Sequence, residues 1–367
     1  MDVKKCLVLL CLSLGTIGFA QEVRELKWYD LSQEKLEGRT SEATANPFQR
    51  FPDSMQAKIR DAVWNLSRNP AGVNFRFYSS AKNISIKYEV EGEQEFPHMP
   101  ATGVSGIDLY KKNENGSWQW VKGNFHFSDT ISYTFKVSGL KENDLNEYML
   151  YLPLYASLKW MKLGINKAEK FETGKPEKHA PIVTYGTSIT QGACASRPGN
   201  AWTNKLSRSI DTPVLNFGFS GNGRLEPEII DYISQLEAKV YILDCLANFT
   251  SGQGLNDSTA YKRLITSVKT LRKDNPETPI ILTDHAGYPG GEVYAPKKEL
   301  YENLNIANKK AFKDLKGLGI KGIYLLSYKQ LNLTAEDFVD GVHPTDGGME
   351  KYSKAYEQVL DSIDSLQ

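Results

Sequence analysis

Two short segments, far apart in the chain, carry the residue types that nucleophilic attack on an ester needs. Asp340 and His343 lie three residues apart in the segment Asp-Gly-Val-His-Pro, and Ser188 lies in the segment Gly-Thr-Ser-Ile-Thr-Gln-Gly. A hydroxyl is a weak nucleophile at neutral pH, so it needs a base, and the base needs a carboxylate that fixes its tautomer. We therefore predict Ser188 as nucleophile, His343 as general base and Asp340 as the group that orients His343.

Acyl transfer passes through an oxyanion, which needs preorganised hydrogen-bond donors. Gly221 lies in Ser-Gly-Asn-Gly, residues 220–223, and Asn248 follows the apolar run at 240–243. We predict an oxyanion hole made of the backbone N–H groups of Ser188 and Gly221 and the side-chain amide of Asn248. A plain turn glycine and an Asn-led turn are the alternative interpretations of the last two.

The elements that position these residues follow from hydrophobic patterning. Apolar runs predict strands at 181–185, 214–217, 240–243, 280–283 and 323–326. Helical periodicity predicts helices at about 201–210, 226–236, 259–273, 297–315 and 347–363. Continuous apolar strands that alternate with helices are typical of an α/β domain with a parallel five-stranded sheet covered on both faces. Ligands of such sheets bind beyond the carboxyl ends of the strands, where the predicted site residues lie.

The first half of the chain has a different pattern. Short runs of strand-forming residues predict strands at 74–78, 83–90, 106–110, 118–121, 131–137 and 147–153. Several short strands at this spacing favour an antiparallel β-sandwich. A polar segment with Gly and Pro, residues 172–178, resembles a linker. We predict a β-sandwich domain over 21–172 and an α/β domain over 178–367.

The first 20 residues have the pattern of a cleavable signal peptide. Lys4 and Lys5 precede an apolar stretch at 7–19, and Gly-Phe-Ala at 18–20 is a small-x-small cleavage site. The apolar stretch is too short to span a bilayer, and we find no other transmembrane candidate. We expect cleavage after about Ala20 and export to a periplasm or beyond.

Bulk composition excludes some partners. Lys plus Arg and Asp plus Glu both number 44, so the net charge is zero and nothing indicates binding of nucleic acid or of an anionic membrane surface. Cys194 and Cys245 follow the signal peptide, and we consider both two buried thiols and a disulfide. Zinc-binding spacings, the dinucleotide fingerprint and the Gly-x-Ser-x-Gly elbow are not present. The predicted mechanism needs no metal or cofactor.

Five further residues are weaker candidates for substrate contact. They are Arg197, Arg224 and His285, beside the predicted loops, and His98 and Asp108 of the first domain, which can reach the site across the interface. Structural ion pairs are the alternative for the two arginines, and a hydrogen-bonded structural role is the alternative for His285.

The second half resembles a known family. Gly186-Thr187-Ser188, Gly221, Asn248 and Asp340-x-x-His343 resemble, in order, the four blocks of the SGNH (GDSL-like) hydrolases over about residues 180–367. The resemblance implies a flavodoxin-like three-layer α/β/α fold, in which Ser188, Gly221, Asn248 and His343 are the name-giving residues and Asp340 completes the triad. Two blocks depart from the family, since Gly-Thr-Ser-Ile replaces Gly-Asp-Ser-Leu and Asp244-x-x-x-Asn248 replaces Gly-x-Asn-Asp.

The first half carries a second resemblance. Residues 98–110, His-Met-Pro-Ala-Thr-Gly-Val-Ser-Gly-Ile-Asp-Leu-Tyr, resemble the jelly-roll-like β-sandwich that precedes SGNH esterases of gut Bacteroidota-type bacteria. Relatives of that kind include esterases that remove acetyl groups from polysaccharides, which implies a small acyl ester on a carbohydrate as substrate. Two alternatives are a lipase-like acylhydrolase or thioesterase, and a carbohydrate-binding protein whose hydrolase domain is an inactive relic.

Overall fold

The computed structural model describes residues 25–40, 44–138, 144–174, 179–250 and 254–365. The predicted signal peptide, residues 1–20, and most of the predicted linker lie outside these ranges. Among the helices of the described ranges, none is long and apolar enough to cross a membrane.

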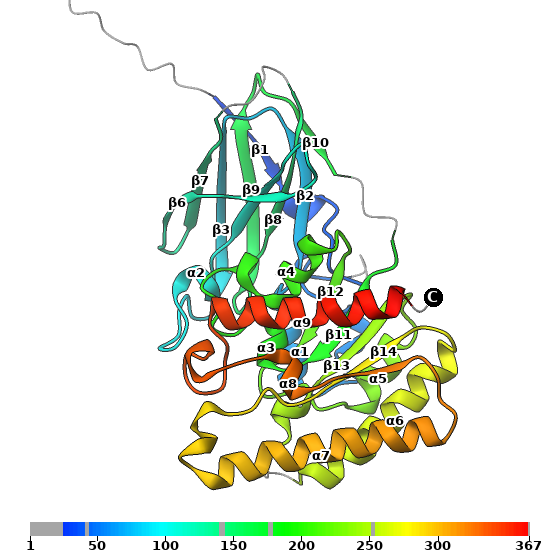
Figure 1. Ribbon diagram of the computed structural model, residues 1–367. Coiled ribbons are helices and arrows are strands. Elements are labelled where there is room, and N and C mark those ends of the chain that lie inside the picture. The colour runs from blue at the N-terminus through cyan, green and yellow to red at the C-terminus, as the bar shows by residue number, and fades with distance from the viewer. Residues whose placement is uncertain (1–24, 41–43, 139–143, 175–178, 251–253, 366–367) are drawn as a thin grey trace, which may run out of the picture.

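The N-terminal half forms two antiparallel five-stranded sheets that pack face to face (Figure 1). The strands are β1 (Leu26–Asp30), β2 (Asn74–Ser79), β3 (Asn83–Glu91), β4 (Asp108–Lys112), β5 (Trp118–Val121), β6 (Gly123–His126), β7 (Ile131–Lys136), β8 (Asn146–Tyr151), β9 (Ser157–Asn166) and β10 (Phe171–Thr173). Their order is β1-β9-β3-β7-β6 in one sheet and β10-β2-β8-β4-β5 in the other. The predicted β-sandwich is therefore confirmed.

Period-two alternation accounts for the strands that the sequence predicts. In β3, Ile84, Ile86 and Tyr88 point into the core and the residues between them face outward. The six predicted strands agree with the structure to within two residues at each end. β1, β6, β9 and β10 are additional. β9 lies between β1 and β3, and its register against β3 shifts opposite Glu89 and Val90. At Gly164 of β9, a Cβ atom would collide with the Trp28 ring.

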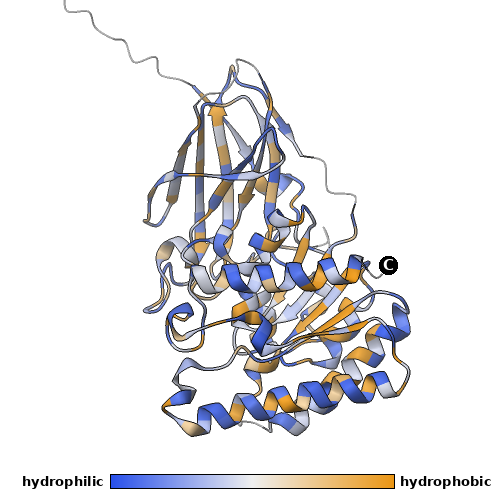
Figure 2. Cartoon of the chain, viewed as in Figure 1, coloured by the Kyte–Doolittle hydropathy of each residue, from blue (hydrophilic) through white to orange (hydrophobic). Residues whose placement is uncertain are grey.

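The C-terminal half has a parallel sheet with helices on both faces. Its strands are β11 (Ile182–Gly186), β12 (Val214–Gly218), β13 (Val240–Asp244), β14 (Ile280–Thr283) and β15 (Ile323–Leu326), in the order β12-β11-β13-β14-β15. This order, 2-1-3-4-5, is the flavodoxin-like one. The predicted α/β/α domain with five parallel strands is confirmed. Figure 2 shows hydrophobic residues concentrated on these strands, while the long outer helix α7 (Ala295–Gly317) also carries many hydrophilic ones.

Two separate cores lie against the two faces of this sheet. One contains residues of α5 (Pro227–Ile233), α6 (Asp257–Asp274) and α7, and the other contains residues of α4 (Trp202–Ser209) and α9 (Asp346–Asp364). The remaining short helices are α1 (Asp61–Ser67), α2 (Ala101–Val104), α3 (Ser188–Gln191), α8 (Tyr328–Leu331), and the 3₁₀ helices η1 (Leu31–Gln33), η2 (Asp53–Met55), η3 (Pro198–Asn200), η4 (Leu246–Asn248), η5 (Pro289–Glu292) and η6 (Ala335–Asp337).

One segment of the N-terminal half packs against the C-terminal domain. Phe51 and Val63 belong to the same core as α5 and α6. The buried Arg50 guanidinium donates to the carbonyl oxygens of Asn216 and Gly218, at 2.8 Å each, on the edge strand β12. Burial lowers the pKa of Arg50 to about 9. The two halves are thus joined by chain that crosses from one core to the other.

Candidate active site

The β11–α3 turn presents Ser188. Thr187 precedes α3 in an extended conformation, and its hydroxyl accepts the N–H of Ile189, which caps the helix. Gly186 ends the strand, and a Cβ there would collide with the Thr190 side chain. Gly192 ends the helix with φ +105°, a left-handed conformation that suits glycine. The tight turn therefore follows from the residues on either side of Ser188.

The structure brings Ser188, His343 and Asp340 into one hydrogen-bonded chain. His343 Nε2 lies 2.8 Å from Ser188 Oγ, and His343 Nδ1 lies 2.7 Å from Asp340 Oδ2. Ser188 is 6% exposed and follows β11, the first strand of this sheet along the chain, whereas the other two lie in the loop before α9. The arrangement is that of a nucleophile, a base and a carboxylate that orients the base.

The loop 340–343 is folded by Asp340 itself. Its Oδ1 accepts the backbone N–H groups of Val342 at 3.0 Å and His343 at 2.9 Å, and Gly341 lies between with φ +79°. Partial burial opposes ionisation of Asp340, but the hydrogen bonds from the His343 backbone and ring outweigh it and lower the pKa of the carboxyl. The short Asp-x-x-His spacing thus positions both residues, and Asp340 is held as the anion.

Two backbone N–H groups of the predicted oxyanion hole have no protein acceptor among the described residues. Among the described residues, neither Ser188 N–H nor Gly221 N–H donates a hydrogen bond. Gly221 has φ +66°, and a Cβ there would meet nothing within 4 Å, so the left-handed turn rather than crowding favours glycine. Unpaired N–H groups of this kind can stabilise an oxyanion.

Asn248 lies at the end of η4, and its amide supports the neighbouring loop. Its Nδ2 donates to the carbonyl oxygens of Gly223 at 3.0 Å and Phe219 at 3.3 Å, and the residue is 9% exposed. Both amide hydrogens therefore bind the loop that carries Gly221. Donation by Asn248 to an oxyanion stays a prediction.

Arg197 lies at the boundary of the two domains. Its Nη1 donates to Asp108 Oδ2 at 2.8 Å and to the Tyr110 hydroxyl at 2.7 Å, and its guanidinium lies 4.4 Å from the centre of the Trp120 ring. Asp108 also accepts the N–H of Gly199 at 2.7 Å. The ion pair, which the sequence leaves as the alternative to substrate contact, is present.

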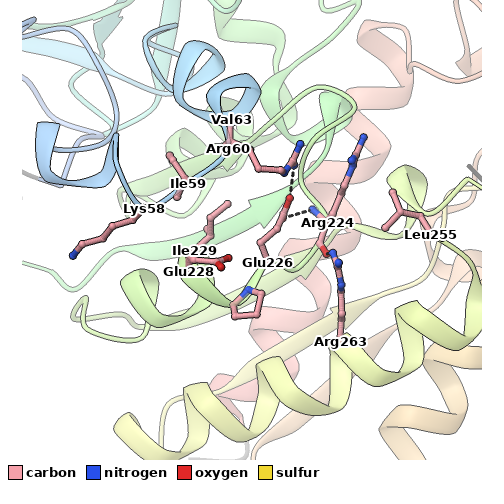
Figure 3. Close-up of a pocket in the computed structure, with 11 residues that line it drawn as sticks. Lys58, Ile59, Arg60, Val63, Arg224, Glu226, Glu228, Ile229, Leu255 and Arg263 are labelled. Carbon is pink, nitrogen blue, oxygen red and sulfur yellow. Dashed lines mark hydrogen bonds and ion pairs between the residues drawn. The ribbon is translucent and has the colours of Figure 1, made fainter. Parts of the chain in front are cut away.

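Arg224 borders a cavity of about 340 Å³ beside the Gly221 loop (Figure 3). Its Nε donates to the Gly221 carbonyl at 3.0 Å. Arg60 and Arg263 line the same cavity, and Arg60 also pairs with Glu226. Partial burial and these two arginines lower the pKa of Arg224. Arg224 therefore lies close to the predicted oxyanion hole, while its contact with substrate stays a prediction.

His285 is enclosed by protein. It is 3% exposed, its Nδ1 accepts the N–H of Gly287 at 2.9 Å, and its ring packs against Tyr288 and Tyr301. Burial lowers the pKa of His285 to about 3, so the ring is neutral. The structure favours the structural role that the sequence gives as the alternative, because no open face of the ring is left for a substrate.

The β-sandwich domain supplies residues that the sequence singles out weakly or misses. The His98 ring stacks on the His343 ring with 5.8 Å between centroids. The Tyr155 hydroxyl donates to the Ser188 carbonyl at 3.3 Å. His98 belongs to the jelly-roll-like segment at 98–110, whereas Tyr155 lies in the β8–β9 connection and has no motif that marks it.

The two cysteines are not bonded to each other. Cys194 and Cys245 are both buried free thiols, so the disulfide alternative is wrong. Cys194 follows α3 with φ +65°, and its Sγ lies 3.2 Å from the His98 carbonyl oxygen. Cys245 donates to the Tyr185 carbonyl in the core of the α/β domain.

The chain belongs to the GDSL-like lipase/acylhydrolase (SGNH) family, a family of carboxylic ester hydrolases. Residues 179–361 match that family, and residues 26–171 match the family described as the N-terminus of Esterase_SGNH_hydro-type. No curated protein sequence matches this chain.

Solved structures show the same two-domain architecture. A Bacteroides ovatus protein assigned to the GDSL-like lipases is 28% identical, with a TM-score of 0.84 over 93% of this chain and 98% of its own. The salicylyl-acyltransferase SsfX3 from a tetracycline biosynthetic pathway is 18% identical, with a TM-score of 0.73 over 92% and 98%. The acetyl xylan esterase Est2A from the rumen bacterium Butyrivibrio proteoclasticus is 12% identical, with a TM-score of 0.54 over 93% and 97%. The similarity to SsfX3 and to Est2A shows a shared fold and nothing more.

Proposed function

We propose that this protein is an exported serine esterase that removes a small acyl group, such as acetyl, from a carbohydrate. The observation that carries the esterase reaction is the hydrogen-bonded chain from Asp340 through His343 to Ser188, with contacts of 2.7 and 2.8 Å. These distances allow proton transfer without rearrangement of the protein.

The reaction follows from the positions of these groups. Ser188 Oγ attacks the ester carbonyl while His343 Nε2 takes the hydroxyl proton, and Asp340 stabilises the resulting imidazolium. The N–H groups of Ser188 and Gly221 stabilise the oxyanion. His343 then protonates the leaving alcohol, and an acyl group remains on Ser188. Water, activated by His343, hydrolyses this acyl-enzyme in the second half of the reaction.

Asn248 contributes in two ways in this mechanism. Its shorter hydrogen bond, to Gly223, holds the loop that carries Gly221. Its longer contact, 3.3 Å to Phe219, is weak enough to exchange for the oxyanion when one forms.

The carbohydrate part of the proposal has separate support. The signal-peptide pattern at 1–20 favours an extracellular substrate. The N-terminal β-sandwich is of the type that precedes SGNH esterases. Est2A, a fold relative, is an acetyl xylan esterase. An acetylated polysaccharide is the substrate that is consistent with all three.

The test compares p-nitrophenyl acetate with p-nitrophenyl octanoate, followed by acetate release from acetylated xylan. Ser188→Ala is expected to lower the rate by roughly 10⁴-fold or more, because the nucleophile is lost. Ser362→Ala, which changes a serine on the outer helix α9, is the matched control and should retain full activity. Equal rates for wild type and Ser188→Ala would exclude the mechanism and favour a carbohydrate-binding protein with a relic hydrolase domain. A preference for octanoate would favour the lipase-like acylhydrolase.

A further inference from the structure

Four residues of metal-binding types meet where the β-sandwich touches the loop that carries His343. One ligand atom each from His98, Cys194, Asp340 and His343 lies within 4.8 Å of the others. His98 comes from an exposed turn of the N-terminal domain and Cys194 from the turn after α3. The cluster is therefore assembled from both domains, and only half of it belongs to the catalytic chain described above.

The donor set suits a particular class of cation. One thiolate, two imidazoles and one carboxylate are the ligands of tetrahedral Zn²⁺ sites, whereas Mg²⁺ prefers oxygen ligands and retains water. Tetrahedral zinc places its ligand atoms about 3.3–3.8 Å apart, given bonds of ~2.0–2.3 Å. The present spread of up to 4.8 Å needs only a small contraction.

His98 can supply that contraction. Its ring is exposed and stacks on the His343 ring at 21°, so a rotation of the His98 side chain turns a nitrogen toward the other ligands. Cys194 lies against the turn that carries His98, since its thiol donates to the His98 carbonyl oxygen at 3.2 Å, and its Sγ is within 4.8 Å of the other ligand atoms.

We propose that His98, Cys194, Asp340 and His343 bind Zn²⁺ or a similar thiophilic divalent cation, and that this binding reversibly inhibits the esterase. Coordination of the metal by either ring nitrogen of His343 inhibits the enzyme. Metal on Nε2 takes the lone pair that accepts the Ser188 proton, whereas metal on Nδ1 forces the remaining ring proton onto Nε2. In both cases His343 can no longer act as base. Removal of the metal restores it.

Binding exchanges a proton for the metal. Cysteine binds zinc as the thiolate, so Cys194 must give up its thiol proton to become a ligand. The metal therefore replaces a bound proton, forming the Cys194 S–Zn bond and releasing one H⁺ to solvent.

The first test measures p-nitrophenyl acetate hydrolysis by the full chain during titration with Zn²⁺, with Mg²⁺ as the hard-cation control and EDTA for reversal. Zn²⁺ is expected to inhibit and Mg²⁺ to have no effect. Cys194→Ser, which keeps the small polar side chain at φ +65°, and His98→Gln should each raise the inhibitory Zn²⁺ concentration by about 10–100-fold. His126→Gln, an exposed histidine on β6 of the same domain, should match wild type. Equal Zn²⁺ sensitivity of all four proteins would overturn the proposal.

The inhibition assay requires esterase activity and therefore rests on the proposed function. A second measurement, of cobalt binding, does not depend on that activity. Co²⁺ added to the full-length Ser188→Ala protein should give a thiolate-to-cobalt charge-transfer absorption. Cys194→Ser in the same background should abolish that absorption without lowering the melting temperature. Absorption that survives in Cys194→Ser would show that the metal lies elsewhere. If Ser188→Ala and wild type both lack esterase activity but the cobalt signal depends on Cys194, the proposed function fails while the metal site stands.

Discussion

The hydroxyl of Tyr155, in the β8–β9 connection of the β-sandwich, donates a hydrogen bond to the backbone carbonyl of Ser188 at 3.3 Å. The same carbonyl accepts the N–H groups of Gly192 and Ala193, which close the α3 turn. The preceding Leu154 carbonyl accepts Nε2 of the buried Gln191 at 3.2 Å. The N-terminal domain thus contacts the helix that presents the nucleophile, and is a structural part of the site.

Removal of the Tyr155 hydroxyl should weaken this support. Tyr155→Phe keeps the ring and its packing, so the expected loss is one hydrogen bond, worth about 1 kcal/mol. We expect a fall in kcat of up to about tenfold, with KM nearly unchanged, because a displaced Ser188 affects the reaction more than binding. Steady-state kinetics check this, with Tyr261→Phe on α6 as the matched control. A kcat equal to that of wild type would mean that the contact has no role in catalysis.

Asp340→Asn should nearly abolish activity while leaving the fold intact. An amide at this position still accepts a backbone N–H, but it no longer stabilises the His343 imidazolium or selects the right tautomer. The expected fall in kcat is about 10⁴-fold. Glu336→Gln, which changes an exposed acid in the same loop region, should have little effect. A loss of less than tenfold in Asp340→Asn would remove Asp340 from the mechanism.

The two roles of Asn248 can be separated by kinetics. Asn248→Ala removes both the support of the Gly221 loop and the proposed oxyanion donor, and we expect a fall in kcat of about 10²–10³-fold. Asn248→Asp keeps an acceptor but not the donors, so it should be at least as damaging. If only KM rises in both variants, Asn248 positions the substrate and does not stabilise the transition state.

Much of the architecture could be predicted because the strand patterns and the helix patterns along the chain indicate the same fold. Apolar strands such as 240–243 alternate with amphipathic helices, and this pattern leads directly to a parallel sheet with loops at its carboxyl edge. Ser188, Gly221, Asn248, Asp340 and His343 are recognisable because their order matches successive strand ends. The structure then shows His343 within hydrogen-bonding distance of both Ser188 and Asp340.

Contacts between distant segments were less accessible to sequence reasoning. Tyr155 lies outside any motif, and its position near Ser188 depends on how the two domains pack. Phe51 and Val63, within the predicted β-sandwich range, enter the core of the other domain. His285 follows a strand end just as Ser188 does, but Tyr288 and Tyr301 enclose it. A position after a strand end identifies a polar residue as a candidate site residue. Only the packing of the folded chain shows whether its side chain is accessible to a substrate.

The interface pair of Asp108 and Arg197 should stabilise the domain arrangement. Asp108 is 3% exposed and accepts hydrogen bonds from Arg197, Gly199 and Trp120. Asp108→Ala removes the carboxylate that accepts from all three donors, and we expect a loss of about 3 kcal/mol of stability. The exposed pair of Lys298 and Glu292 gives a control, since Glu292→Ala should cost less than about 1 kcal/mol. Denaturant titration compares the two, and equal losses would argue against a structural role for the interface pair.

Asp244, which begins the segment Asp244-x-x-x-Asn248, should make stability depend on pH. It is fully enclosed next to Tyr356, and burial raises the pKa of its carboxyl to about 7. Since an unfolded Asp titrates near 3.9, the folded state binds more protons between about pH 4 and pH 7. This contribution to stability is therefore fully present below pH 4 and is lost as pH rises through 7. At pH 8 the ionised carboxylate costs up to about 4 kcal/mol.

Asp244→Asn removes that ionisation, so the variant should gain stability over wild type at pH 8 and much less at pH 5. Melting temperatures at both pH values check this, with Asp361→Asn on the exposed side of α9 as the control. If the melting temperatures of Asp244→Asn and wild type differ by the same amount at both pH values, Asp244 does not titrate in this range. The sign of the stability change at pH 8 is informative. A gain on removal of the charge identifies a buried carboxylate that costs stability, unlike Asp340, whose hydrogen bonds favour the anion.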